Sequence, residues 1–329
     1  LNLYIYNTHT DTHTHHILIR RRYSNRSLSS SSSSSSSLIT MSHSDDNRVT
    51  RQVIKNFFVK LQEEGEGALV RNAITEMDQK LLDPFVLLVE FSFSLSVGYP
   101  DHPHRGFESL TYILKGGIVH NDLKGHKSII KAGDVQWMTA GRGIIHSEYP
   151  EQEVNNGLQL WINLPSIHRM IEPKNLELSG SEIPKAEEDG VEVKVIAGDS
   201  MGIKSPCQTT TPMMYLDFTL KPGSQTHQTV PESWTAFAYI LEGDEGLFSS
   251  MDSSAISAHN VVVFGPGELV SVWNKSSSRS LRFLLIAGKP ISEPMVQSGP
   301  FVMSSQAEID MAFEDYQNAK NGFEMAKSS

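Results

Sequence analysis

The chain has 329 residues, of which 39% are hydrophobic, so it is long enough for two ordinary domains with buried cores. Its formal net charge is −10, and an acidic chain repels phosphate backbones, which argues against direct nucleic-acid binding. Cys207 is the single cysteine, which excludes an intramolecular disulfide framework and suits a reducing compartment. No apolar run reaches the ~18 residues of a membrane helix, so we expect no membrane association.

Residues 1–40 differ in composition from the rest of the chain. They combine a threonine–histidine repeat with an unbroken serine run, Ser29–Ser37, and neither can build a core. The segment is serine-rich, arginine-bearing and poor in acids, as organellar transit peptides are, but the first methionine is Met41. We therefore expect untranslated or disordered sequence rather than a targeting peptide.

From about Arg51 onward, short apolar runs alternate with turns rich in Gly, Pro, Asn and Asp. This pattern predicts an all-β fold, a sandwich or a barrel. One helix is predicted near the C-terminus, where Ser305 and Glu308 form a capping box and Gly322 ends the helical pattern. The apolar runs include "FVLLVEFSF", "LTYILKGG", "LQLWINL", "MMYLDFTL", "TAFAYILEG" and "LRFLLIAG".

An internal repeat divides the β-rich region. "TYILKGG" (111–117) and "AYILEGD" (238–244) align at an offset of 127 residues, and a turn follows each, "KAGD" or "GPGE". Chance similarity of such short runs is the alternative explanation. We predict two copies of one β-fold, with residues 1–40 outside the fold, an N-terminal metal-binding domain at 41–170, a linker at 171–190, a C-terminal domain without metal at 191–303, and a helix and tail at 304–329.

Two pairs of metal-ligand residues have the spacing of one strand face. His102 and His104 are two residues apart, and so are His146 and Glu148. Alternate residues of a strand point to the same side, roughly 7 Å apart at ~3.3 Å rise per residue, so each pair can face one ion. Three imidazoles and one carboxylate predict a metal site with open coordination positions, which suits iron(II) and dioxygen chemistry.

Glu108 competes with Glu148 for the carboxylate role. It shares strand parity with His102 and His104, but a chain bend at Gly106 could carry it inward or away. The pattern of residues leaves both carboxylates open as ligands.

The other histidines of the β-rich region are weaker candidates. His120 and His126 flank a predicted hairpin loop, and His168 follows the last strand of the first domain, so we expect all three to be solvated or locally hydrogen-bonded. In the second copy, the offset of 127 residues makes Thr229 and Pro231 the equivalents of His102 and His104. Neither residue type is a usual metal ligand, so only the first copy is predicted to hold metal.

Several long motifs resemble the pirin family of the cupin superfamily: "HPHRGFES", "GDVQWMTAGRGIIHSEYP", "LQLWINLP" and "NAKNGFE". The resemblance covers about residues 50–327. It implies a bicupin, two antiparallel β-barrels packed face to face, with a metal in the N-terminal barrel only. The family's ligands fall on His102, His104, His146 and Glu148, and its usual metal is iron, Fe(II) or Fe(III). Nickel, copper, manganese or zinc also suits such ligands. Ser109, which replaces a common threonine of the family, is not a ligand.

The resemblance implies one function as an enzyme. Some pirins are similar to quercetin 2,3-dioxygenases, which open the flavonol ring with dioxygen and release carbon monoxide. In this hypothesis Glu148 is both a ligand and the base that accepts the hydroxyl proton of a flavonol-type small molecule. Phe107, Trp137 and Met138 could line an apolar pocket for a flat ligand, with core packing as the alternative. Arg105 and Arg142 could orient an anionic substrate, with turn anchoring as the alternative. Glu108, if it is not a ligand, could orient the ligands.

The second implied function is a non-catalytic one. Pirins are described as nuclear proteins that assist transcription factors, with the oxidation state of iron altering a surface. An acidic body disfavours DNA contact but permits a basic transcription or signalling protein as partner. We accordingly expect a monomer in the nucleus, the cytoplasm or both.

Overall fold

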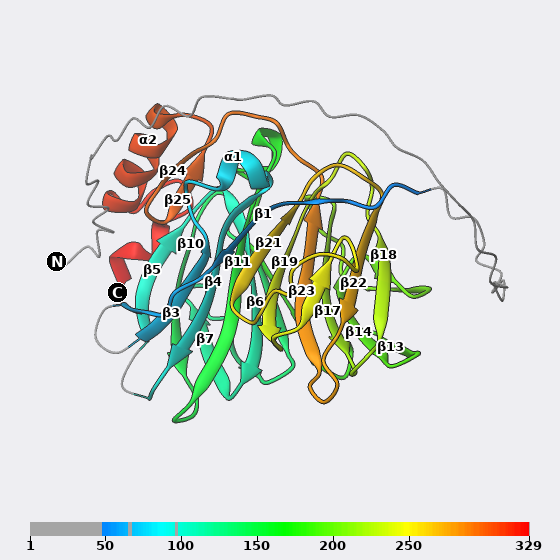
Figure 1. Cartoon of the computed structure of the whole chain (residues 1–329). Coiled ribbons are helices and arrows are strands. Elements are labelled where there is room, and N and C mark those ends of the chain that lie inside the picture. Colours follow the sequence, from blue (N-terminus) through cyan, green and yellow to red (C-terminus); the bar gives the residue numbers. More distant parts are fainter. Residues whose placement is uncertain (1–47, 65–67, 96–97, 329) are drawn as a thin grey trace, which may run out of the picture. The chain divides into compact units, whose positions relative to one another are not determined.

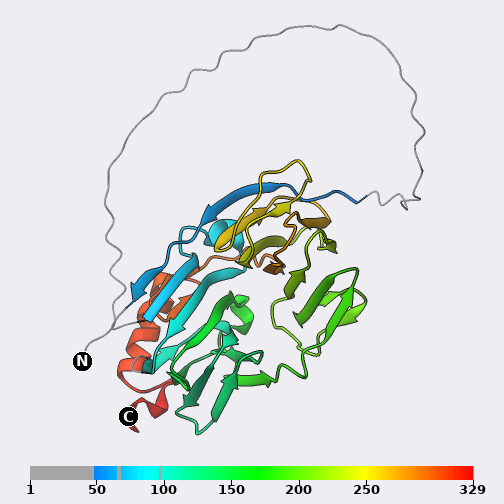
Figure 2. The ribbon, with the colours of Figure 1, turned by 60° about the horizontal axis from the view of Figure 1, so that its bottom comes forward.

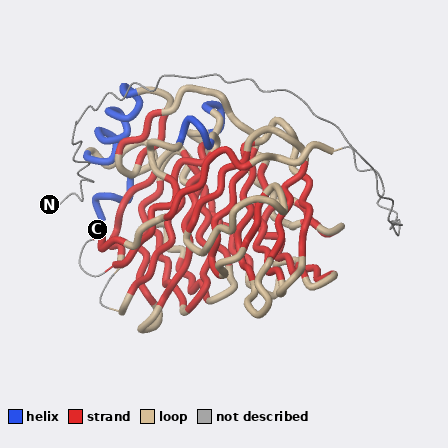
Figure 3. Tube along the Cα trace, viewed as in Figure 1, coloured by secondary structure: helices blue, strands red, loops and turns tan. Residues whose placement is uncertain are grey.

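The computed structural model describes residues 48–64, 68–95 and 98–328, which belong to one compact unit. Strands make up most of this unit and helices are few (Figure 3). Among the described residues, no helix is both long and apolar enough to cross a membrane. The prediction for residues 1–40 lies outside this part of the chain. The helices are α1 (Gln79–Leu82), α2 (Gln306–Gln317) and the short 3-10 helices η1 (Ser166–His168) and η2 (Glu324–Ser328).

The N-terminal barrel is built from two antiparallel sheets (Figure 1). The larger sheet has the order β12 (Lys174–Leu178), β9 (Val135–Thr139), β6 (Phe107–Lys115), β11 (Asn155–Asn163), β4 (Phe85–Phe93), β3 (Ala68–Ile74) and β2 (Gln62–Glu64). The smaller sheet has the order β5 (Tyr99–His104), β10 (Ile144–Pro150), β7 (Gly117–Asp122) and β8 (Lys127–Lys131).

The C-terminal barrel repeats this plan. Its larger sheet has the order β1 (Val53–Phe58), β21 (Asn260–Phe264), β19 (Thr235–Glu242), β23 (Leu281–Gly288), β17 (Met213–Leu220), β14 (Val191–Ala197) and β13 (Lys185–Glu188). Its smaller sheet has the order β18 (Gln225–Thr229), β22 (Leu269–Asn274) and β20 (Gly246–Phe248). A separate two-stranded ladder pairs β15 (Asp199–Ser200) with β16 (Ile203–Lys204). The predicted all-β bicupin fold is confirmed.

The sequence repeat matches the topology, because β6 and β19 hold the third place in their sheets. The turn assignment was wrong, however. "KAGD" precedes β9, whereas "GPGE" precedes β22, so Gly267 of "GPGE" corresponds to Gly143 before β10. The glycines support this equivalence, since Gly143 has φ +147° and Gly267 has φ +142°. The smaller sheets therefore align at an offset slightly below 127 residues.

The chain crosses between the barrels more than once. The first described strand, β1, pairs with β21 of the C-terminal barrel before the chain builds the N-terminal barrel. Residues 171–190, for which the composition suggests a linker, hold β12 of one larger sheet and β13 of the other. The barrels therefore do not correspond to two consecutive halves of the sequence, because β1 and residues 171–190 contribute strands across that boundary.

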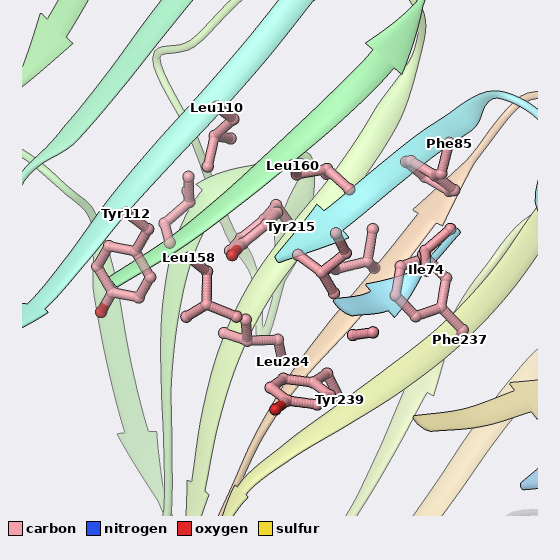
Figure 4. Packing of buried hydrophobic residues seen from close by; sticks show 14 of the residues in the cluster. Ile74, Phe85, Leu110, Tyr112, Leu158, Leu160, Tyr215, Phe237, Tyr239 and Leu284 are labelled. Carbon is pink, nitrogen blue, oxygen red and sulfur yellow. The ribbon is translucent and has the colours of Figure 1, made fainter. Parts of the chain in front are cut away.

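A large apolar core lies between the two seven-stranded sheets. Side chains from both barrels meet there, among them Leu110 and Leu160 from the first barrel and Phe237 and Leu284 from the second (Figure 4). Burial of such apolar surface contributes about 25 cal/mol per Å². The opposite face of each larger sheet is left to line the inside of its own barrel.

The C-terminal segment packs against the N-terminal barrel. Strands β24 (Val296–Ser298) and β25 (Phe301–Met303) form a hairpin ahead of α2, and the red α2 lies beside the blue and cyan strands in both views (Figures 1 and 2). The predicted cap at Ser305 is confirmed, because its Oγ accepts from the Glu308 backbone N–H, whereas the Glu308 carboxylate accepts from the Ser304 backbone N–H and not from that of Ser305. An apolar cluster joins this segment to Ile145 of β10.

Candidate metal centre

The two predicted ligand pairs lie on neighbouring strands. β5 and β10 are antiparallel, and their register places His102 opposite His146 and His104 opposite Ile144. The register shifts between His146 and Glu148, so Glu148 stands opposite Tyr99. The strand pairing thus delivers three imidazoles to one place from two short sequence motifs.

Three histidines form a group that could hold a metal ion. One ligand nitrogen from each of His102, His104 and His146 lies within 4.8 Å of the others. Their ring centroids are 4.3 to 4.9 Å apart. Glu148 lies outside this group in the described part of the chain, so its role as the fourth ligand stays a prediction.

Hydrogen bonds fix which ring nitrogen is free in two of the three imidazoles. The Nδ1 of His102 lies 2.8 Å from the Pro100 carbonyl oxygen, and the Nδ1 of His104 lies 3.4 Å from that of Pro300. A carbonyl only accepts, so each Nδ1 carries the proton and each Nε2 keeps its lone pair. The His146 Nε2 is buried without a hydrogen-bond partner among the described residues. These free nitrogens fit a metal ion.

The three imidazoles are neutral near neutral pH, which is the form that binds metals. Burial lowers the pKa of all three, and for His104 and His146 the pKa is well below the usual value because neighbouring imidazoles also repel a positive charge. For His102, the Pro100 carbonyl and Asp101 partly oppose this lowering. Metal binding near neutral pH therefore displaces no proton from these rings.

The prediction for His120 was wrong. Its side chain is fully buried, and its Nε2 lies 2.8 Å from the His146 Nδ1. Burial lowers the pKa of His120 to about 4, although Asp122 favours the charged ring. The other two predictions hold better, since His126 is partly exposed and lies 2.8 Å from Glu177, and His168 is exposed.

Glu148 is a buried carboxylate on β10, two residues after His146. It is 5% exposed, and burial raises its pKa to about 7, while a hydrogen bond from Gln159 opposes this shift. The Gln159 Nε2 donates to the carboxylate at 3.3 Å, and the Trp161 Nε1 donates to the Gln159 Oε1 at 2.8 Å. Sequence reasoning missed Gln159. Its signal was a polar residue in the apolar strand "LQLWINL", on the same side as Trp161.

The raised pKa of Glu148 gives metal binding a defined pH dependence. Below about pH 7 the carboxyl keeps its proton, and a metal that binds Glu148 must displace it. We expect the affinity for a divalent metal to rise as the pH rises towards 7 and to level off above it. Chelator competition from about pH 5.5 to about pH 8.5 checks this. In Glu148→Gln the slope should disappear, and an unchanged slope would show that another group supplies the proton.

Glu108 and Trp137 lie away from the histidines. Gly106 has φ +88°, and a Cβ there would lie 1.8 Å from the Val302 carbonyl oxygen, so the chain turns sharply between β5 and β6. Glu108 then faces the C-terminal barrel, where its Oε1 accepts from Thr210 at 2.8 Å. Trp137 belongs to the core between the barrels. The prediction that either residue lines the metal pocket is therefore corrected, because both lie on the other face of their sheet.

Phe107 and Met138 lie on the face that lines the inside of the barrel. The Phe107 ring is 5.2 Å from the His104 ring and stacks on Trp161 at 4.2 Å. Met138 packs with Ala140 and Ile144. The Phe107–Trp161 pair thus forms a flat aromatic surface beside one candidate ligand.

Arg105 and Arg142 anchor the chain. The Arg105 side chain is buried and donates from Nε to the Arg142 carbonyl oxygen, from Nη1 to Asp315 and from Nη2 to the Asn321 carbonyl oxygen. Arg142 is partly exposed and pairs with Glu172 at 2.7 Å. The sequence left two roles open, substrate orientation and turn anchoring, and these contacts match turn anchoring.

The second barrel has different residues at the equivalent positions. With Gly267 aligned on Gly143, Val270 and Val272 stand where the first barrel has His146 and Glu148, and both belong to an apolar core. Gln228 pairs with Val270 as His102 pairs with His146, and Val230 follows it. An apolar interior has replaced the ligand set there.

Comparison with known proteins agrees with this arrangement. The family model "Pirin" matches residues 67–162, and the model "Pirin C-terminal cupin domain" matches residues 215–322. The chain is 80% identical over 283 residues to Pirin-1 of Arabidopsis thaliana, covering 86% of this chain and 99% of that protein. The chain belongs to the pirin family.

Solved structures place this pirin-family chain among bicupins. A quercetin 2,3-dioxygenase from Acinetobacter baumannii superimposes with a TM-score of 0.77 at 31% identity, covering 84% of this chain and 99% of that chain. The bacterial pirin YhhW from Escherichia coli, in complex with nickel(II), has a TM-score of 0.58 at 19% identity, covering 72% and 100%. At that identity, the second likeness shows the fold alone.

Proposed function

We propose that this chain is a metal-dependent dioxygenase of the quercetin 2,3-dioxygenase type, which cleaves the ring of a flavonol with dioxygen and releases carbon monoxide. The observation that carries the proposal is the convergence of three neutral imidazoles, with a buried carboxylate two residues along β10 from one of them. The likeness to a quercetin 2,3-dioxygenase supports the reaction type.

The metal would be held by His102, His104 and His146, with Glu148 as the fourth ligand. Iron is the metal we expect, and nickel, copper, manganese or zinc also suits the donor set. The bound ion would supply Lewis acidity and, for a redox metal, electron exchange with dioxygen. Closed structural zinc sites use four protein ligands at tetrahedral geometry, whereas iron accepts further ligands.

The protein's own groups would bind and deprotonate the substrate. Once metal binding has displaced its proton, the Glu148 carboxylate can accept the flavonol hydroxyl proton. Gln159 holds the carboxylate, and Trp161 orients the Gln159 amide through its Oε1. The stacked Phe107–Trp161 pair makes the surroundings of His104 apolar and aromatic, which suits a flat aromatic ligand.

Turnover of a flavonol tests this function. The full chain, loaded anaerobically with iron(II) or separately with nickel(II) or manganese(II), would be mixed with quercetin and dioxygen. We expect loss of flavonol absorbance with release of carbon monoxide. Protein that demonstrably holds metal but turns over no flavonol with any of these ions would overturn the proposal.

The two carboxylates provide a matched comparison. We expect Glu148→Gln to weaken metal binding and to end turnover, because it removes an anionic ligand and the candidate base. Glu108→Gln should keep metal and turnover, because its carboxylate contacts Thr139 and Thr210 instead of the histidines. Metal content and flavonol turnover of both variants decide this. The assignment is reversed if Glu108→Gln empties the site and Glu148→Gln leaves it full.

The alternative role as a redox-sensitive partner of transcription or signalling proteins, and a nuclear or cytoplasmic location, stay predictions from the family resemblance. Loss of partner binding on metal removal would support that role.

A further inference from the structure

His120 is a buried histidine directly behind one metal-ligand candidate. β7 pairs with β10 so that His120 stands opposite Glu148, on the face that carries His146. The His120 Nε2 lies 2.8 Å from the His146 Nδ1, and the two ring centroids are 4.9 Å apart. The side chain is completely buried. It is therefore held in place by the barrel and cannot turn out to solvent.

The partner of His146 differs in kind from those of the other two histidines. His102 and His104 face the carbonyl oxygens of Pro100 and Pro300, which can only accept a hydrogen bond. Their Nδ1–H tautomers are therefore fixed by the backbone. A ring nitrogen such as the His120 Nε2 either donates or accepts, depending on its own tautomer.

The direction of this hydrogen bond decides whether neutral His146 can bind metal. If His120 accepts, the His146 Nδ1 carries the proton and the buried Nε2 presents its lone pair. If His120 donates, the single proton of neutral His146 must sit on Nε2, which then has no lone pair for an ion. The His146 Nε2 has no hydrogen-bond partner among the described residues, so nothing else seen there fixes the tautomer.

We propose that His120 is a positioning residue of the metal centre: its Nε2 accepts from the His146 Nδ1–H and so holds His146 in the tautomer and orientation that direct Nε2 at the metal. This inference rests on the metal site of the proposed function but requires no flavonol chemistry. Partners of metal-ligating histidines typically contribute 10- to 100-fold in metal affinity. Without the acceptor, neither tautomer of His146 has a hydrogen-bond partner for its N–H among the described residues, so nothing there holds the proton on Nδ1.

The test uses cobalt(II) as probe, because its visible spectrum reports the ligand set. The full chain would be compared as wild type, His120→Leu, His120→Gln and His126→Leu, with cobalt(II) affinity measured by chelator competition. We expect His120→Leu to bind about 10- to 100-fold more weakly with an altered spectrum. His120→Gln, whose amide oxygen can accept, should recover most of the affinity. His126→Leu is the matched control, since His126 pairs with Glu177 instead, and it should match wild type.

Metal-free protein supplies an independent measurement. The ¹⁵N shifts of the His146 imidazole should show the Nδ1–H tautomer in wild type and its loss in His120→Leu. Wild-type affinity and spectrum in His120→Leu would overturn the inference. So would equal losses in both His120 variants that follow the fall in their metal-free melting temperatures, because this pattern indicates packing alone. Wild-type protein that binds cobalt(II) yet cleaves no flavonol overturns the dioxygenase but not this role, whereas a failure to bind any metal overturns both.

Discussion

Replacing His104 with alanine is expected to abolish stable metal retention while the β-barrels persist. His104 contributes one of the three nitrogens that lie within 4.8 Å of each other, and two imidazoles cannot enclose an ion as three do. The loss of metal affinity should be larger than about 10- to 100-fold, which is the effect of removing a ligand's hydrogen-bond partner. Metal content after native purification, and affinity by chelator competition, measure it.

The fold of this variant must be followed separately, because His104 is 4% exposed and its truncation leaves a cavity. Far-ultraviolet circular dichroism of the metal-free variant should keep the β spectrum of wild type. His168→Ala serves as control, since His168 is exposed on η1 and outside the histidine group. Stoichiometric metal in a folded His104→Ala variant would show that the ligands have been misassigned.

The histidine cluster was predictable because its information is local. Two residues of a strand at spacing i, i+2 share a face whatever the rest of the chain does, so His102 with His104 and His146 with Glu148 could be read as pairs. That the pairs meet required only that β5 and β10 be neighbours, which the bicupin resemblance implied. The repeat of barrels was also predictable, since "TYILKGG" and "AYILEGD" fill equivalent strands.

The remaining features depend on turns and on pairing between distant strands. Strand parity placed Glu108 with the histidines, but the positive φ of Gly106 starts a new strand whose alternation points Glu108 to the other barrel. His120 reaches His146 only because β7 pairs with β10, which no local pattern reveals. The entry of β1 into the C-terminal barrel is likewise a long-range pairing.

The second large effect is expected at Arg105, which ties the histidine motif to the C-terminal segment. Its guanidinium reaches Asp315 at 2.8 Å and stacks over Phe323 at 4.6 Å. Although burial pushes the pKa of Asp315 upward, hydrogen bonds from Arg105 and Asn321 outweigh it, and the pKa lies below its usual value. Asp315 is therefore a largely buried carboxylate whose charge Arg105 stabilises, together with Asn321 and Lys320.

Arg105→Met keeps most of the side-chain volume but removes every donor. The Asp315 carboxylate then keeps only Asn321 and Lys320 as partners, and the carbonyls of Arg142 and Asn321 lose the Arg105 donors. Removing one member of a buried ion pair costs about 3 to 5 kcal/mol, so we expect a loss of this size in the free energy of unfolding. Denaturant unfolding of the metal-free chain measures it. Arg142→Met is the control, because the Arg142–Glu172 pair is partly exposed and such pairs contribute about 0 to 1 kcal/mol.

A double variant separates the lost charge from the lost packing. In Arg105→Met with Asp315→Leu, no buried carboxylate is left unpaired, so part of the stability should return, and the double-mutant cycle should show coupling between the two positions. The same variants should lower metal affinity, because Arg105 adjoins His104 and its own carbonyl accepts from the Val302 backbone N–H, next to the Pro300 carbonyl that His104 faces. The Arg105–Asp315 pair does not hold α2 against β5 if the free energy of unfolding of Arg105→Met lies within about 1 kcal/mol of wild type. Additive effects of the two substitutions would lead to the same conclusion.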